Sequence, residues 1–136
     1  MNEGERVGIA AAVLQAVFAH ARDEAPRECC GLLVGTGSSI DEAVRTANVE
    51  PGTTRYRVDP ADHFRLIKRL RGTGRDILGA YHSHPRSPAR PSPTDIAEAS
   101  GEGFLYVIAS LAEGTPEIRA FRIHGAAARE VTLEPR

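Results

Sequence analysis

The chain has 136 residues, which is enough for one domain with a substantial core and too few for a second domain of any size. Hydrophobic residues make up 41% of the sequence and charged residues 26%, as is usual for a globular protein. Because the formal net charge is only -1, composition gives no electrostatic reason to expect binding to nucleic acid or to an anionic membrane.

The first predicted element is a helix over residues 7–22. Apolar residues recur there every four positions, which places them on one helix face: Ile9, Val13, Val17 and Ala21. Pro26 follows this run, and we expect the helix to end before it. His20 falls in the last turn, where a positive charge favours the helix dipole, so we interpret it as structural or exposed rather than as a metal ligand.

The N-terminal apolar run resembles a secretory signal peptide, but the residues before it are not those of a signal peptide, so we expect a cytoplasmic protein. A signal peptide begins with basic residues, whereas Glu3 and Glu5 outnumber Arg6 here.

Cys29 and Cys30 are adjacent, so on a strand their side chains point to opposite faces. They lack the spacing of a thiolate metal site, and we interpret them as small buried residues of a protein in a reducing compartment.

A strand and its hairpin partner are predicted next. Residues 28–34 form a short apolar run that is closed by Gly35 and Gly37, and residues 40–49 are expected to pair with it. Glu28 opens the first of these strands. By itself, a glutamate in this position is most simply a solvated residue at a strand end, with little reason to be catalytic.

A short strand at residues 55–58 is expected to lead into a second helix. Asp59 is a favourable N-cap and Pro60 suits the first helical position, while Gly72 marks the end. His63 lies in the first turn and is expected to be solvated. We predict that the helix packs through an apolar stripe, supported by Leu66, of Phe64, Ile67 and Leu70.

Two histidines lie at the end of the next predicted strand, residues 77–84. His82 and His84 are two positions apart, so on a strand they project from the same face and could chelate one metal ion. Pro85 cannot continue a sheet ladder, so the strand is expected to stop there and to leave the pair at its open end, where a bound metal would be reachable from solvent. A His-x-His pair also occurs by chance, and spacing alone leaves both interpretations open.

Asp95 is the candidate for a third ligand, after a loop that contains three prolines. Two imidazoles and one carboxylate suit a catalytic zinc ion with water in the fourth position. However, Ser92, Pro93 and Asp95 are also a good helix start, with Ser92 as N-cap. Ser92 could serve both purposes, whereas we do not expect one oxygen of Asp95 both to cap strongly and to bind a metal.

The remaining pattern alternates helices with strands. A short helix is expected at residues 93–100, and strands at residues 104–111, 117–124 and 129–134. The predicted fold class is α/β (α+β), with one mixed sheet in a single domain that spans residues 1–136.

Together, these residues resemble the JAMM metallopeptidases, also called MPN-plus or JAB domains. The signature is His82-x-His84-Pro85, six further residues and Ser92-x-x-Asp95, preceded far upstream by Glu28 at the start of an apolar strand. The resemblance covers nearly the whole chain and is closest to the small single-domain prokaryotic members. It implies an MPN-like mixed β-sheet flanked by two main helices, with a short helix after the metal loop.

The resemblance also implies roles for these residues. His82, His84 and Asp95 would hold one Zn2+ per chain, Glu28 would be the general base, and Ser92 would stabilise the oxyanion. The implied substrate is a ubiquitin-like sulfur-carrier protein, cleaved after its C-terminal Gly-Gly to release cysteine. Removal of ubiquitin-like modifiers from lysine is the alternative.

A non-catalytic MPN scaffold is disfavoured, because all five signature positions are present. The sequence does not distinguish a monomer from a homodimer. Arg86 and Arg90, in the proline-rich loop, could attract an acidic carrier or simply be solvated.

Overall fold

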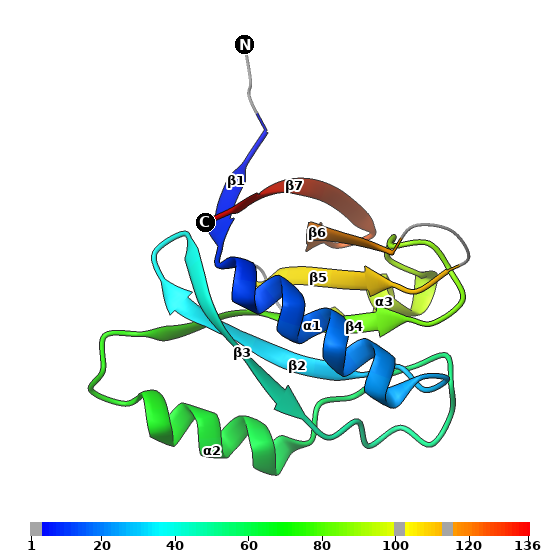
Figure 1. The fold of residues 1–136 in the computed structure, drawn as a ribbon, viewed down its shortest axis with the longest axis horizontal. Coiled ribbons are helices and arrows are strands. Elements are labelled where there is room, and N and C mark those ends of the chain that lie inside the picture. Colours follow the sequence, from blue (N-terminus) through cyan, green and yellow to red (C-terminus); the bar gives the residue numbers. More distant parts are fainter. Residues whose placement is uncertain (1–3, 100–102, 113–115) are drawn as a thin grey trace.

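The computed structural model describes residues 4–99, 103–112 and 116–136. In chain order, their helices and strands are β1 (Arg6–Ile9), α1 (Ala11–Glu24), β2 (Cys30–Thr36), β3 (Ser39–Thr46), α2 (Pro60–Leu70), β4 (Asp76–His84), α3 (Pro93–Ala97), β5 (Leu105–Ser110), β6 (Glu117–His124) and β7 (Ala127–Pro135) (Figure 1). Helices and one mixed sheet are thus combined as the predicted α+β class requires.

The described strands form one closed sheet in the order β1-β3-β2-β4-β5-β6-β7, with β1 also paired to β7. The hairpin of β2 and β3 is antiparallel, as expected, and β2 is also antiparallel to β4. On its other side, β4 runs parallel to β5. The strand that carries the two histidines therefore has a long neighbour on each side, which fixes its backbone.

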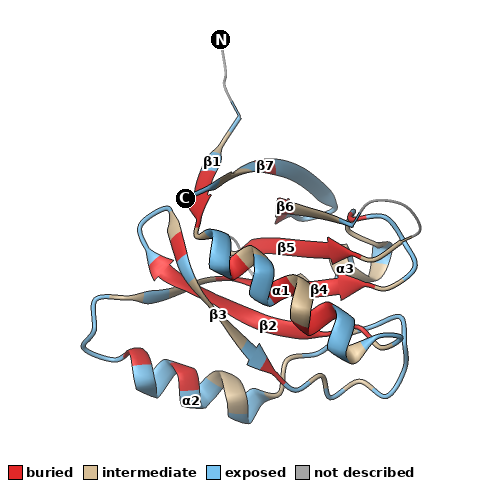
Figure 2. Cartoon of the chain, viewed as in Figure 1, coloured by how far each residue is buried: buried red, intermediate tan, exposed pale blue. Residues whose placement is uncertain are grey.

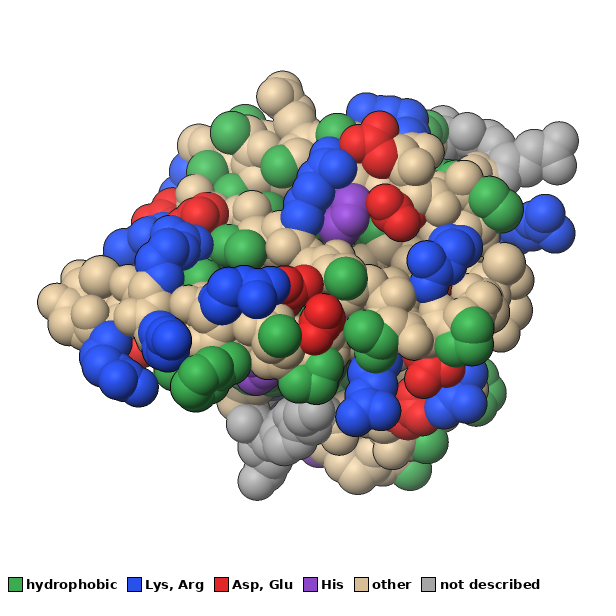
Figure 3. Space-filling view, turned by 90° about the horizontal axis from the view of Figure 1, so that it is seen from below, with side chains coloured by type: hydrophobic (Ala, Val, Ile, Leu, Met, Phe, Trp, Pro, Cys, Tyr) green, Lys and Arg blue, Asp and Glu red, His purple; other side chains and the backbone are tan. Residues whose placement is uncertain are grey.

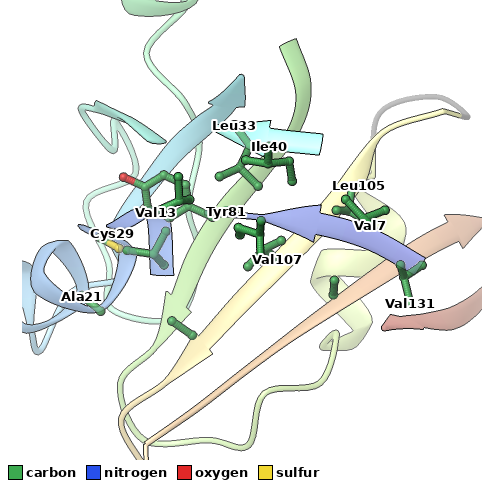
Figure 4. Close-up of a cluster of buried hydrophobic side chains, with 14 residues drawn as sticks. Val7, Val13, Ala21, Cys29, Leu33, Ile40, Tyr81, Leu105, Val107 and Val131 are labelled. Carbon is green, nitrogen blue, oxygen red and sulfur yellow. The ribbon is translucent and has the colours of Figure 1, made fainter. Parts of the chain in front are cut away.

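Helix α1 packs on one face of this sheet through Val13 and Val17, which join a buried cluster with Leu33, Tyr81 and Val107 (Figure 4). The predicted start of this helix was wrong, because Arg6–Ile9 forms β1 and the helix begins at Ala11. The physical reason is that Val7 and Ile9 alternate as in a strand, and their backbone pairs with β7 and β3. A four-residue apolar spacing continued through this strand by coincidence.

Helix α2 begins as predicted, since the Asp59 side chain accepts a hydrogen bond of 2.9 Å from the backbone N–H of Ala61. Its predicted stripe was wrong in two positions. Phe64 is 56% exposed and Ile67 42% exposed, whereas Leu66 and Leu70 are buried. The buried pair packs against the opposite sheet face from α1, on a cluster of Leu32, Val34 and Ala80. Figure 2 shows that much of α2 is exposed, so a narrow contact is enough to hold it.

Two further boundaries differ from expectation. Residues 55–58 do not form a strand; the structure has an isolated bridge between Asn48 and Val58, and the intervening residues form a loop. Helix α3 ends at Ala97, and the predicted end at residue 100 lies outside the described residues. The strands at β4, β5, β6 and β7 agree with the predicted ones to within two residues at each end. Among the described helices, none is long and apolar enough to cross a membrane.

The surface has mixed charge. On the face shown in Figure 3, basic side chains are interspersed with acidic and hydrophobic ones. Several charged side chains of the protein pair across elements, for example Arg75 with Asp41 and Glu42, and Arg45 with Asp23. Such a surface differs from the one-signed patch that binds a phosphate backbone.

Candidate metal centre

The two histidines face one another at the carboxyl end of β4. Their Nε2 atoms are 3.2 Å apart, and both side chains are buried. Strand alternation places them on the α2 side of the sheet, two and four residues after Ala80. The expectation that both project from one face is confirmed.

Helix α3 brings Asp95 to the same point. Its Oδ2 lies 3.1 Å from Nε2 of His82 and 3.1 Å from Nε2 of His84, so the three atoms form a nearly equilateral triangle. Ligands of a tetrahedral zinc ion lie about 3.3 Å from each other when each is 2.0 to 2.2 Å from the metal. The spacing and the donor types therefore fit one zinc ion, and the three side chains could hold it.

Asp95 is also part of the helix cap. Its backbone N–H donates to Oγ of Ser92 at 3.0 Å, and its Oδ2 accepts from the backbone N–H of Ser92 at 2.9 Å. We did not expect one oxygen to serve both purposes, but Oδ2 faces the histidines and accepts the cap bond together, and a carboxylate oxygen has more than one lone pair. The cap therefore fixes the position of the candidate ligand.

The two histidine rings are held in different ways. Nδ1 of His84 is 2.7 Å from the carbonyl oxygen of Pro88, so its N–H donates there and Nε2 keeps a lone pair for a metal. Nδ1 of His82 is buried and has no hydrogen-bond partner among the described residues. Its ring instead stacks on Tyr56, with centroids 4.2 Å apart and planes 17° from parallel.

Glu28 lies just before β2, beside the ligand group. The residue is only 6% exposed, and its Oε1 is buried without a partner among the described residues. Burial, opposed by His84 and reinforced by the charge of Asp95, raises the pKa of Glu28 to about 7. Glu28 shares a cavity of about 290 Å³ with His84 and Ser92. A carboxyl with this pKa, in a cavity beside a candidate metal site, is suited to move protons near neutral pH.

A second cavity, of about 520 Å³, lies beside Asp95 and is also lined by Tyr56 and His63. His63 was expected to be solvated but is only partly exposed there. Tyr56 was assigned to a strand and not singled out. The sequence offers no signal for either position, because Tyr56 reaches the cavity through the folding of a loop and His63 through the packing of α2 against the sheet.

His20 and the two cysteines lie in the core. Nδ1 of His20 is 2.7 Å from the hydroxyl of Tyr81, which makes it structural, as expected. Cys29 and Cys30 are buried free thiols. Burial raises the pKa of Cys29 to about 12 and that of Cys30 to about 11, so neither is ionised near neutral pH. This agrees with the interpretation of both as small buried residues.

The chain is similar to known proteins over most of its length. The profile of the family described as prokaryotic homologs of the JAB domain matches residues 10–124. A probable TtuB-protein conjugate cleaving protease of Thermus thermophilus is 39% identical over 110 residues, which cover 80% of this chain and 70% of that protein. The CysO-cysteine peptidase of Mycobacterium tuberculosis is 34% identical over 130 residues, 93% of this chain and 87% of that one. Among solved structures, protein DSY2949 of Desulfitobacterium hafniense superposes with a TM-score of 0.87 at 30% identity and covers 96% of this chain and 92% of its own.

Proposed function

Because the chain belongs to the family of prokaryotic JAB-domain homologues, we propose that it is a zinc-dependent peptidase that cuts the amide bond after the C-terminal Gly-Gly of a ubiquitin-like sulfur-carrier protein. The observation that carries the proposal is the meeting of three ligand atoms, 3.1 to 3.2 Å apart, beside the buried carboxyl of Glu28. We assign one zinc ion per chain to His82, His84 and Asp95. When bound, zinc would act as a Lewis acid and lower the pKa of a coordinated water towards ~7.

Glu28 is assigned the proton transfers. Hydrolysis forms a bond between the water oxygen and the glycine carbonyl carbon, and breaks the bond from that carbon to the leaving nitrogen. The Glu28 carboxylate accepts a proton from the attacking water and then donates it to the leaving nitrogen. Burial raises the pKa of Glu28 to about 7, and the charge of a bound zinc ion would favour the carboxylate form that accepts the proton.

Ser92 is assigned to the oxyanion that develops on the glycine carbonyl. Its Oγ accepts a hydrogen bond from the backbone N–H of Asp95, so its own O–H remains available as a donor. The side chain lines the same cavity as Glu28 and His84. A hydrogen bond that forms only to the oxyanion stabilises the transition state more than the substrate.

The substrate assignment rests on size and on the relatives. A tail that enters a cavity of about 290 Å³ must be narrow, and glycine lets the backbone pass closely because it has no side chain. The Mycobacterium tuberculosis relative is named for CysO-cysteine, which favours release of cysteine from a carrier. The Thermus thermophilus relative is named for cleaving TtuB-protein conjugates, which favours the alternative of an isopeptide bond to lysine. We place the protein in the cytoplasm, where buried free thiols remain reduced.

The test is to offer the zinc-loaded protein two carrier adducts that end in Gly-Gly, one joined to cysteine and one to a lysine side chain. We expect cleavage after the last glycine, with a higher kcat/KM for the cysteine adduct, measured by mass spectrometry of the products. Adducts ending in Gly-Ala and Ala-Ala test whether the cavity admits only a tail without side chains. Equal rates for all three tails would refute it and indicate a general peptidase, and a protein inactive on every adduct would refute the proposed function.

A further inference from the structure

The side chain of Asn48, just after β3, uses its full hydrogen-bonding capacity. Its Nδ2 donates to the carbonyl oxygen of Glu28 at 2.9 Å and to that of Arg55 at 3.2 Å. Its Oδ1 accepts from the backbone N–H of Glu50 at 3.0 Å and from that of Arg57 at 2.9 Å. A carboxamide has two N–H donors and two acceptor lone pairs, and all four are engaged here.

These bonds join two segments that are far apart in the sequence. One is Glu28, two residues before β2, and the other is the loop of residues 49–57, which we call the 49–57 loop. The base of this loop is also closed by backbone bonds from Val49 N–H to the Arg57 carbonyl and from Asp59 N–H to the Ala47 carbonyl, each of 3.0 Å. Asn48 lies at this base and links it to the Glu28 backbone.

The 49–57 loop reaches the metal ligands through Tyr56. The Tyr56 ring stacks on His82, whose Nδ1 has no hydrogen-bond partner among the described residues. A ligating histidine is normally oriented by a hydrogen bond from its second nitrogen. Since His82 lacks this bond, the stacked ring supplies the orientation, and the position of Tyr56 depends on how the loop is held.

We propose that Asn48 is a positioning residue that sets the general base and one metal ligand relative to each other. It fixes Glu28 through the backbone carbonyl of that residue, and it fixes His82 through the 49–57 loop and Tyr56. One side chain thus adjusts both the proton-transfer group and the metal site without touching the substrate. This inference rests on the proposed function for the role of Glu28, but its effect on zinc binding does not require that the substrate be correct.

The experiment compares four variants of the full chain with the parent. Asn48→Ala removes all four bonds, Tyr56→Leu removes only the stacked ring, and Tyr56→Phe keeps it. Thr73→Ala is the matched control, because it removes two side-chain hydrogen bonds, at 2.6 and 3.1 Å, at the far end of α2. Zinc affinity is measured by competition with a chromophoric chelator, and kcat and KM are measured on zinc-saturated protein well below the melting temperature.

We expect Asn48→Ala to weaken zinc binding about tenfold and to lower kcat about tenfold or more, with KM nearly unchanged, as is usual for groups that support metal ligands. Tyr56→Leu should weaken zinc binding to a similar extent but leave kcat at zinc saturation within about threefold. Tyr56→Phe and Thr73→Ala should match the parent in both.

Asn48→Ala with zinc affinity and kcat within twofold of the parent would overturn the proposal, even if its melting temperature falls. Weakened zinc binding with unchanged kcat would overturn the part that concerns Glu28. If Asn48→Ala does not fold, Asn48→Asp keeps the acceptor for Glu50 and Arg57 but loses the N–H donors to the carbonyl oxygens of Glu28 and Arg55. An unchanged kcat in that variant would also overturn the part of the proposal that concerns Glu28. A parent that binds zinc but cleaves no adduct refutes the proposed function alone, because zinc affinity still tests Asn48.

Discussion

The two sides of the candidate site are built in different ways. On the ligand side, from His82 to Asp95, the hydrogen bonds among the ligand side chains, the cap at Ser92 and the bond from His84 to Pro88 span at most 13 positions, while the ring stacked on His82 comes from more distant Tyr56. The base side joins Glu28 to the 49–57 loop through residues 20 or 21 positions apart, by way of Asn48 and Arg27. A local segment can set its own geometry, whereas the base side depends on correct packing of β2 against the rest of the sheet.

Loss of a ligand should have the largest effect. We expect His82→Ala or Asp95→Ala to lose zinc and all measurable peptidase activity, because two protein ligands rarely hold a catalytic zinc ion. Metal analysis of the purified variants gives the zinc content, and circular dichroism checks the fold. A chelator should abolish the activity of the parent, and added zinc should restore it. Full zinc occupancy in either variant would contradict the ligand assignment.

Removal of the general base should lower activity without affecting zinc binding, which distinguishes the base side of the site from the ligand side. Glu28→Gln keeps the shape of the side chain but cannot accept a proton, so we expect kcat to fall by a factor on the order of 10² to 10⁴ while zinc content stays near one per chain. The measurements are metal analysis and single-turnover kinetics. A Glu28→Gln variant without zinc would indicate that Glu28 supports the metal site rather than proton transfer.

Ser92 tests whether the cap and the oxyanion role can be separated. Ser92→Asn retains a good N-cap but removes the hydroxyl, so we expect a loss of about 10²-fold in kcat with little change in thermal stability. Ser92→Thr keeps both the cap and the hydroxyl and serves as the control. If Ser92→Asn were as active as the parent, Ser92 would be assigned only to the helix cap.

The smallest effect is expected from the cysteines, although they directly follow Glu28 in the chain. A double change of Cys29 and Cys30 to Ala or Val should leave kcat/KM within about twofold, at a stability cost of about 1 to 2 kcal/mol for refilling the strand. Thermal melts and steady-state kinetics check this. Loss of activity in a folded, zinc-loaded variant would show that a thiol takes part in the chemistry.

The sequence was most informative where structure is local. The start of α2 at Asp59, the facing of His82 and His84, and the resemblance to the JAMM family were all predicted and are confirmed. The roles of Glu28 and Ser92 remain predictions. Local patterns carry this information because caps and strand alternation depend only on neighbouring residues.

The features that the sequence did not predict depend on tertiary contacts. Phe64 and Ile67 were predicted to be buried, but α2 meets the sheet through Leu66 and Leu70, and no local pattern tells which of two adjacent stripes faces the core. Tyr56 and Asn48 were missed because their partners lie on other elements. Short β1 was hidden because its alternation covers only four residues and also fits the helical spacing that follows.

The shared oxygen of Asp95 has a consequence for local folding. Since Oδ2 both caps α3 and faces the histidines, occupancy of the metal site and formation of the α3 turn are thermodynamically linked. A zinc ion that binds only when α3 is folded must also stabilise α3 by the same free energy. Removal of the metal should therefore first unfold the segment from Pro85 to Ala97. The rate at which an added protease cleaves this segment would then report zinc occupancy without any substrate.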